Sequence, residues 1–173
     1  MKKKFLATLC VVGAFGVLCT PARAQSEPQH PLQVSLAAQK IEVTNGKETF
    51  KDAGRVKPGD VIEYRSVYVN RGKESLKGVS GTLPIPTGTE YIIESANPSN
   101  VNANTVANPA YAPAPLTRTI SVNGAARTVR VPASEYKSLR WDLGEIRAGE
   151  RRAVSLRVRV LSNQFEKATP TKQ

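Results

Sequence analysis

The sequence predicts an all-β protein, an antiparallel β-sandwich of seven to nine short strands preceded by a cleaved signal peptide. Apolar residues alternate with polar residues in several short runs, which is the pattern of strands with one buried face. Turn sequences rich in Gly, Pro and Asn separate these runs. Outside the signal segment, no window of a dozen residues repeats apolar positions at helical spacing. Short strands joined by turns, without helices, favour two packed antiparallel sheets.

Residues 1–24 have the organisation of a secretory signal peptide. Three lysines precede an apolar run over residues 5–18, and the small-x-small sequence Ala22-Arg23-Ala24 follows it. At 14 residues, this run is short for a membrane span, which needs roughly 20 apolar residues. We therefore expect export through the Sec pathway to the periplasm, the cell surface or the medium. No transmembrane helix is expected after cleavage.

The formal charge of +11 on 173 residues overstates the case for nucleic-acid binding. Four of the 25 basic residues and none of the 14 acidic residues lie within residues 1–24, so cleavage lowers the charge to +7. Cys10 and Cys19 are removed with the same segment, which leaves no cysteine for a disulfide. About 150 residues are enough for one stable core. We expect a flexible segment 25–31, one domain over residues 32–163 and a polar tail 164–173.

The first strand is expected to be interrupted. Its apolar residues stand at even positions over residues 32–36 and at odd positions over residues 41–43, which predicts a bulge or a change of sheet between them. Asn45-Gly46 follows as a turn signal. Residues 61–69 end with apolar residues on both faces, which indicates a central strand.

The remaining strands are expected over residues 79–85, 90–94, 116–122, 127–131, 139–144 and 154–160. The sequence Asn123-Gly124 predicts that the third and fourth of these form a hairpin. Residues 95–117 carry no charge, show no apolar period and contain several prolines, which block pairing in a sheet. We interpret this segment as a long surface loop, of a length that is usually either functional or mobile.

Four segments occur in an order and spacing that match a known family. They are Lys57-Pro58-Gly59-Asp60-Val61-Ile62-Glu63-Tyr64, Val69-Asn70-Arg71-Gly72, Leu83-Pro84 with Gly88 and Tyr91, and Leu139-Arg140-Trp141-Asp142-Leu143-Gly144-Glu145-Ile146-Arg147-Ala148-Gly149-Glu150. Together they resemble a bacterial exported repeat domain, catalogued as domain of unknown function number eleven, over roughly residues 41–160. The resemblance implies an immunoglobulin-like sandwich in an exported bacterial protein, and it implies no reaction.

The chain departs from this family in three respects. The family usually has an Asp just before its Leu-Pro pair, where this chain has Gly81-Thr82. The segment of residues 95–138 is longer than the corresponding part of the family's pattern. This chain also holds one copy of the domain, where most relatives have tandem repeats. The motif residues suit structural roles in turns, strand ends and the core. These structural residues are Gly59, Asp60, Tyr64, Asn70, Gly72, Trp141, Gly144 and Gly149.

No catalytic, cofactor-binding or metal-binding residue is predicted, and no cofactor is expected. His30 is the one histidine of the chain, and it lies between prolines ahead of the first strand. Without a cysteine in the mature chain, a single histidine cannot complete a zinc site with N or S ligands. A Ser-His-Asp or Cys-His nucleophile system would need His30 brought into the core, which its place in a tail between prolines does not favour. Glu63 beside Arg65, and Asp142 near Glu145, are interpreted as charge partners on neighbouring strands rather than as a glycosidase pair.

Most of the net positive charge of the mature chain falls between residues 127 and 159, a range that contains nine basic and four acidic residues. One interpretation is a solvated strand face whose arginines discourage pairing at the sheet edge. The other is a patch that binds lipid phosphates, acidic glycans or a protein partner. Nucleic acid is not expected, since no aromatic residues are interleaved for stacking. The candidate contact residues are Arg147, Arg151, Arg152, Arg157 and Arg159.

The sequence therefore predicts an exported, non-enzymatic, immunoglobulin-like module with a structural or protein-interaction role in the bacterial cell envelope. Its partner would be an envelope protein or polymer, and the oligomeric state stays open. The alternative is an anion- or glycan-binding module that uses the arginine-rich strand face. A third hypothesis is strand addition, in which a partner pairs with an exposed sheet edge. A hydrolase comes last.

Overall fold

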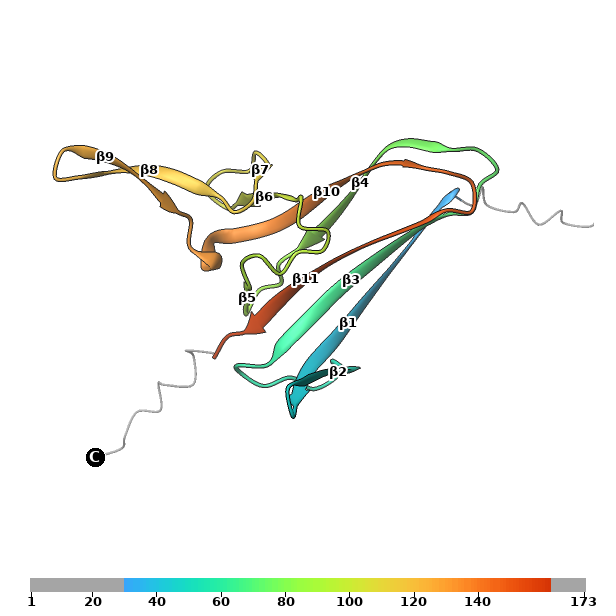
Figure 1. The fold of residues 1–173 in the computed structure, drawn as a ribbon, viewed down its shortest axis with the longest axis horizontal. Helices are drawn as coiled ribbons and strands as arrows, with labels where there is room; N and C mark the ends of the chain where they lie inside the picture. The colour runs from blue at the N-terminus through green and yellow to red at the C-terminus, as the bar shows by residue number, and fades with distance from the viewer. Residues whose placement is uncertain (1–29, 163–173) are drawn as a thin grey trace, which may run out of the picture.

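The computed structural model describes residues 30–162, and within them the chain is all-β and built from antiparallel sheets, as predicted (Figure 1). The signal peptide expected over residues 1–24, nearly all of the segment 25–31 and the tail 164–173 lie outside the described residues. The one helical element in this range is the 3-10 turn η1 (Ala133–Glu135). The strands are β1 (Leu32–Thr44), β2 (Lys47–Asp52), β3 (Val61–Asn70), β4 (Leu76–Pro84), β5 (Thr89–Tyr91), β6 (Asn102–Thr105), β7 (Ala112–Pro113), β8 (Thr117–Val122), β9 (Ala125–Arg130), β10 (Tyr136–Ile146) and β11 (Arg151–Val160).

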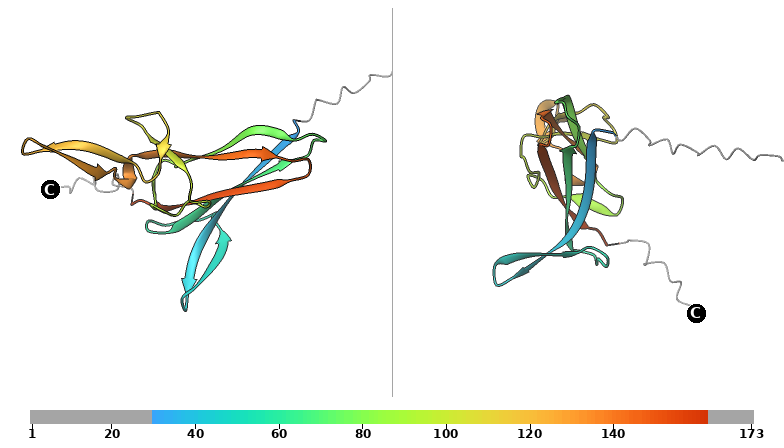
Figure 2. Two further views of the ribbon diagram at one scale, coloured as in Figure 1. Left: turned by 45° about the horizontal axis from the view of Figure 1, so that its top comes forward. Right: turned by 90° about the vertical axis from the view of Figure 1, so that its right-hand side faces the viewer.

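The strands form two sheets and a separate hairpin. Sheet A has the order β2-β1-β3-β11-β5, and sheet B has the order β4-β10-β6-β7. β8 pairs with β9 alone, and this hairpin projects from the rest of the molecule in both Figure 1 and Figure 2. The expected number of strands was too low, because β2 and the short strands β6 and β7 lack the apolar alternation on which the count depended.

Two hairpins are closed by the same two-residue turn. Asn45-Gly46 joins β1 to β2 and Asn123-Gly124 joins β8 to β9, and all four residues have positive φ. Positive φ at both central positions matches the right-handed twist of the flanking strands, and Asn followed by Gly adopts it at little cost. The hairpin expected around Asn123-Gly124 is confirmed within one residue at each outer end.

The apolar faces of the two sheets meet in one core. Val154, Leu156 and Val158 of β11 all point inward and are buried, as the alternation in the last strand predicts. Trp141 of β10 is 1% exposed, and its indole N–H donates a 2.7 Å hydrogen bond to the carbonyl oxygen of Pro98. The arrangement is sandwich-like, with β4 and β10 lying over β3 and β11.

The expected interruption in the first strand was wrong. β1 pairs with β3 in one unbroken register from Leu32, which faces Asn70, to Ile41, which faces Val61. The apolar side chains change parity because the two ends of β1 bury different faces. Leu32 packs against the core between the sheets, whereas Ile41 is buried on the opposite face of sheet A.

The interpretation of residues 95–117 as one surface loop was also wrong. β6 pairs with β10 and β7 pairs with β6, so this segment supplies two strands of sheet B. Ala103 is fully buried, and Leu116 belongs to the core. Small and uncharged side chains let this segment pack closely without the large apolar residues that mark an ordinary buried strand.

Candidate functional site

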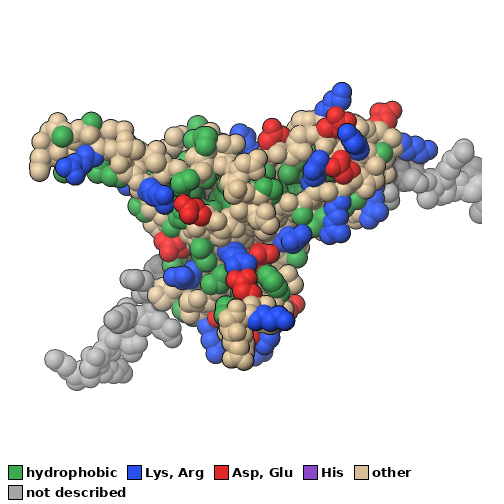
Figure 3. All heavy atoms as spheres, in the orientation of Figure 1, with side chains coloured by type: hydrophobic (Ala, Val, Ile, Leu, Met, Phe, Trp, Pro, Cys, Tyr) green, Lys and Arg blue, Asp and Glu red, His purple; other side chains and the backbone are tan. Residues whose placement is uncertain are grey.

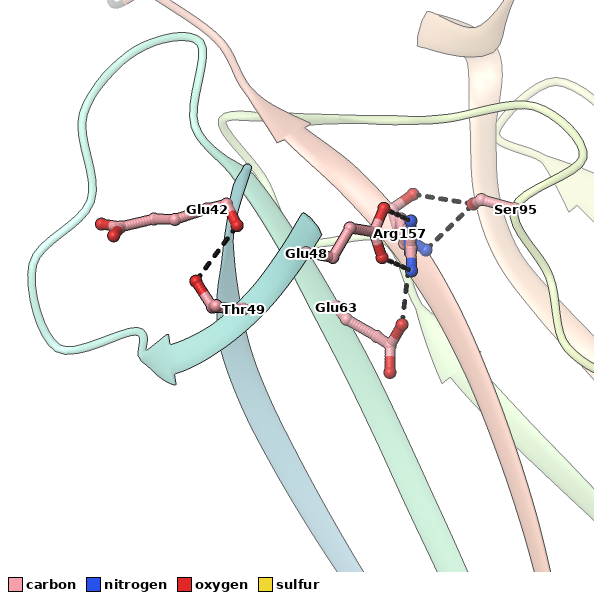
Figure 4. A network of polar contacts seen from close by, with 6 residues as sticks. All are labelled: Glu42, Glu48, Thr49, Glu63, Ser95 and Arg157. Carbon is pink, nitrogen blue, oxygen red and sulfur yellow. Dashed lines mark hydrogen bonds and ion pairs between the residues drawn. The ribbon is translucent and has the colours of Figure 1, made fainter. Parts of the chain in front are cut away.

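Arg157, a predicted contact residue, is held by two carboxylates on the outer face of sheet A (Figure 4). Its two terminal nitrogens donate one hydrogen bond each to the two carboxylate oxygens of Glu48, both at 2.8 Å. Its Nε donates a 3.2 Å bond to Glu63. Paired bonds between a guanidinium and a carboxylate have a fixed geometry and are stronger than neutral ones. Arg157 therefore joins β2 and β3 to β11.

The protonation behaviour of these groups follows from the same contacts. The hydrogen bonds from Arg157 hold the pKa of Glu48 below its ordinary value. Hydrogen bonds to Glu48 and Glu63 raise the pKa of Arg157 above its ordinary value. The charge of Arg157 is thus compensated within the molecule. The sequence predicted Arg157 as a contact residue for an external anion or partner, and in the structure its guanidinium already binds Glu48 and Glu63. Glu48 comes from β2, which the sequence did not predict as a strand.

The other four predicted arginines do not form one patch with Arg157. Arg159 is exposed at the end of β11, beyond Arg157 on the same face. Arg147, Arg151 and Arg152 lie at the opposite end of the strand, and Arg152 forms a 2.7 Å ion pair with Glu150. The structure therefore divides the predicted surface into two separate regions.

The second region gains basic residues from another turn. The backbone N–H of Asn70 donates to the carbonyl oxygen of Glu150, and the N–H of Gly149 donates to that of Asn70, so the β3–β4 and β10–β11 turns lie side by side. Figure 3 shows Lys and Arg side chains gathered there, toward the end where the described chain begins. Six basic residues occupy this region against three acidic ones, Glu74, Glu145 and Glu150. We call the following set the basic end: Arg71, Lys73, Lys77, Arg147, Arg151 and Arg152.

Asn70 connects these turns from within. Its side chain is fully buried, and its amide donates to the carbonyl oxygens of Glu74 at 2.7 Å and Ile146 at 2.9 Å. Its Oδ1 accepts a 2.9 Å bond from the N–H of Gly72. The amide nitrogen of Asn70 thus donates two hydrogen bonds and its oxygen accepts one, so both polar atoms of this buried side chain have partners. Asn70 thereby fixes the shape of the basic end without contacting solvent.

The other predicted structural residues occupy turns and the core. Asp60 accepts a 2.7 Å hydrogen bond from the N–H of Lys57 and pairs with Lys40 at 3.1 Å. Gly59, Gly144 and Gly149 all have positive φ, which a side chain would strain. A Cβ atom on Gly72 would lie 2.9 Å from Cβ of Pro31. Tyr64 is half-buried and packs against the core.

A different feature, which the sequence did not indicate, lies on β1. β2 covers the outer edge of β1 from Gln39 to Thr44, and within residues 30–162 no strand pairs with that edge from Leu32 to Ala38. Figure 1 shows β2 beside the lower end of β1 alone. We call Leu32–Ala38 the bare edge. Its backbone N–H and C=O groups that point away from β3 are available to a further strand.

The bare edge also exposes apolar side chains. Val34 is 52% and Leu36 is 59% exposed. Val34 faces Tyr68 and Leu36 faces Ser66 in the register with β3, and both of these partners are buried on the core side. Val34 and Leu36 therefore extend the core face of sheet A beyond the area that sheet B covers.

Other sheet edges in the described chain carry features that oppose pairing. β2 holds four charged residues among its six, and β5 and β7 are three and two residues long. β4 contains Lys77, Gly78 with positive φ and Pro84, and its register with β10 is shifted twice. Charge, proline, bulges and short length are the usual protections of an edge. Residues 32–39 have no charge, no proline and no break in register.

Among residues 30–162 no group of three or more His, Cys, Asp or Glu side chains could hold a metal ion. No helix in that range is long and apolar enough to cross a membrane. His30 is exposed at its very start.

Comparisons with known proteins return nothing for this chain: no family model, no curated protein and no solved structure matches it. The resemblance to the exported repeat domain therefore stays a prediction.

Proposed function

We propose that this chain is an exported, non-enzymatic, immunoglobulin-like module of the bacterial cell envelope that binds a protein partner by strand pairing at the bare edge. The single observation that carries the proposal is an uncharged edge of seven residues in β1 that no described strand covers. An added strand supplies main-chain hydrogen bonds, and alternating side-chain contacts give it specificity. Val34 and Leu36 offer those contacts.

Three further observations support this function. Residues 1–24 carry the pattern of a signal peptide, which favours export. The two antiparallel sheets and their common core fit an immunoglobulin-like sandwich. Glu63, a carboxylate whose side chain is 12% exposed, is engaged by Arg157 rather than left free for chemistry.

Photo-crosslinking in cells of the source bacterium tests this proposal. A photoreactive amino acid replaces Leu36 on the bare edge, and in the control it replaces Val106, an apolar residue that is 80% exposed between β6 and β7. We expect a discrete protein adduct from position 36 that is absent from position 106. No adduct from position 36, or the same adducts from both positions, would contradict strand pairing at this edge.

A second candidate function is favoured by the basic end. Backbone hydrogen bonds of Asn70 hold the two turns that flank this set of basic residues side by side. Of the six, Arg152 alone forms an ion pair with an acidic side chain within residues 30–162. Such a cluster attracts phosphates or acidic glycans by a long-range, salt-sensitive interaction. This version of the anion-binding hypothesis depends on Arg71, Lys73 and Lys77 in addition to the predicted arginines, and it excludes Arg157.

A further inference from the structure

We propose that the strand that pairs with the bare edge is the bare edge of a second copy of this chain, so that the two sheets A join into one continuous sheet. This inference rests on the proposed function and names its partner. Most soluble homo-oligomers are closed and two-fold symmetric, and an antiparallel pair of identical strands has this symmetry.

The first argument is the charge of the edge. In a two-fold pair, each strand meets its own sequence, so any charged residue near the centre would lie close to the same charge. Like charges opposite each other destabilise a strand pair. Residues 32–39 are free of charge, whereas β2, β4, β8 and β9 all contain Lys or Arg. A partner of another sequence would not need this property, because it could supply the opposite charge.

The second argument is the register. β2 occupies the edge from Gln39 onward, and Pro31 has no N–H to donate, so the pairing segment is limited to Leu32–Ala38. Ser35 is its centre. Antiparallel pairing about Ser35 therefore places Val34 of each copy directly opposite Leu36 of the other.

The third argument is burial. Val34 and Leu36 point to the same face of β1, and together they are the large apolar side chains of the bare edge that are more than half exposed. The two-fold pairing would bring four such side chains into one row, each beside an apolar neighbour. Covering apolar surface of this kind contributes roughly 25 cal/mol per Å² removed from water.

The chain is expressed from its full sequence and purified after export, and analytical ultracentrifugation and native mass spectrometry measure the mass of the species that it forms. Four proteins are compared: the wild type, Val34→Lys/Leu36→Lys, Val34→Lys/Leu36→Glu and Val43→Lys. The last is the matched control, because Val43 is an exposed apolar residue of the same strand where β2 already covers the edge. Circular dichroism verifies that each variant is folded.

We expect a wild-type dimer at about 100 µM, a concentration that detects dissociation constants in the micromolar range. Val34→Lys/Leu36→Lys places like charges opposite each other and should raise the dissociation constant by about tenfold or more. Val34→Lys/Leu36→Glu places opposite charges at the paired positions and should restore the dimer. Val43→Lys should leave it unchanged.

A monomeric wild type would overturn the inference, as would a dimer that survives Val34→Lys/Leu36→Lys. Failure of Val34→Lys/Leu36→Glu to restore the dimer would overturn the register and with it the symmetric pairing. These failures are distinguishable from failure of the proposed function. An adduct between position 36 and a different protein in the crosslinking experiment would keep strand pairing and exclude the second copy as its partner.

Discussion

Arg157 binds both carboxylate oxygens of Glu48 at 2.8 Å, although 109 residues separate the two in the sequence. Glu48 lies on β2, and Arg157 lies on β11, two strands that are not neighbours in sheet A. The pair therefore fastens the β1–β2 hairpin across the outer face of the sheet. This contact gives a predicted binding residue an internal structural role.

Arg157→Gln should loosen the β1–β2 hairpin while the core stays intact. The substitution removes the bidentate bond to Glu48 and the bond from Nε to Glu63. We expect faster amide hydrogen exchange in β2 and unchanged exchange in β10. Arg159→Gln is the control, because Arg159 is an exposed arginine on the same face of the same strand. Equal exchange of β2 in both variants would show that the contact does not fasten the hairpin.

Acidification should loosen the same hairpin. The pKa of Glu48 is lowered in the folded protein, chiefly by its hydrogen bonds with Arg157, from an ordinary value of 4.5. A carboxyl group with a lowered folded pKa contributes stability above its unfolded pKa, and the contribution is lost as the pH falls through the folded pKa. Exchange in β2, measured relative to the intrinsic exchange rate at each pH, should therefore accelerate below about pH 4.5 more in the wild type than in Arg157→Gln. The same acceleration in both proteins would contradict this assignment.

Asn70→Ala should destabilise the whole domain. The change leaves the buried carbonyl oxygen of Ile146 and two further backbone groups without their partner. Unsatisfied buried groups of this kind cost about 2 to 4 kcal/mol in total, measured by urea denaturation. Asn70→Asp should cost more, since a carboxylate would face two carbonyl oxygens.

Asn100→Ala is the control for this measurement. Asn100 is exposed in the connection before β6, and no side-chain hydrogen bond of Asn100 is found in the described structure. Its replacement should change the free energy of unfolding by less than about 0.5 kcal/mol. Similar losses in the free energy of unfolding for Asn70→Ala and Asn100→Ala would contradict the claim that the hydrogen bonds of Asn70 stabilise the two turns.

Removing charge from the basic end should weaken binding to anionic polymers. Arg147→Gln/Arg151→Gln/Arg152→Gln should elute from heparin at lower salt than the wild type, because fewer cations contact the polymer. The control removes the same number of positive charges from the β8–β9 hairpin, at Arg118, Arg127 and Arg130. Equal shifts in both triple variants would mean that net charge, rather than this site, determines the retention.

The strands that sequence patterns predicted best are those with clear alternation. Residues 154–160 fall within β11, and residues 61–69 correspond to β3. β2 was not predicted, because Lys47–Asp52 is mostly charged and pairs as an edge strand that needs no buried face. β6 was missed because its buried residues are small or polar, so no apolar period marks them.

The site was less predictable than the fold. The partner of Arg157 is brought to it by a strand that was not foreseen, and long-range pairing cannot be read from local patterns. Gly81 shows how a tertiary contact determines the residue at one strand position. A Cβ atom there would lie 2.8 Å from the hydroxyl oxygen of Tyr68, so the ring occupies the space a side chain would need. The bare edge could not be predicted from the sequence, because its extent depends on where the pairing of β2 with β1 ends.

The central claim is that another strand pairs with the bare edge, and amide hydrogen exchange of β1 tests it most directly. The exchange of Leu32–Ala38 is compared between the purified chain at about 1 µM, where micromolar complexes dissociate, and the same chain in a concentrated extract of the cells that produce it. Pairing predicts that amides of the bare edge exchange about tenfold or more slowly in the extract, with β4 unchanged. Equal exchange of Leu32–Ala38 under both conditions would contradict the claim.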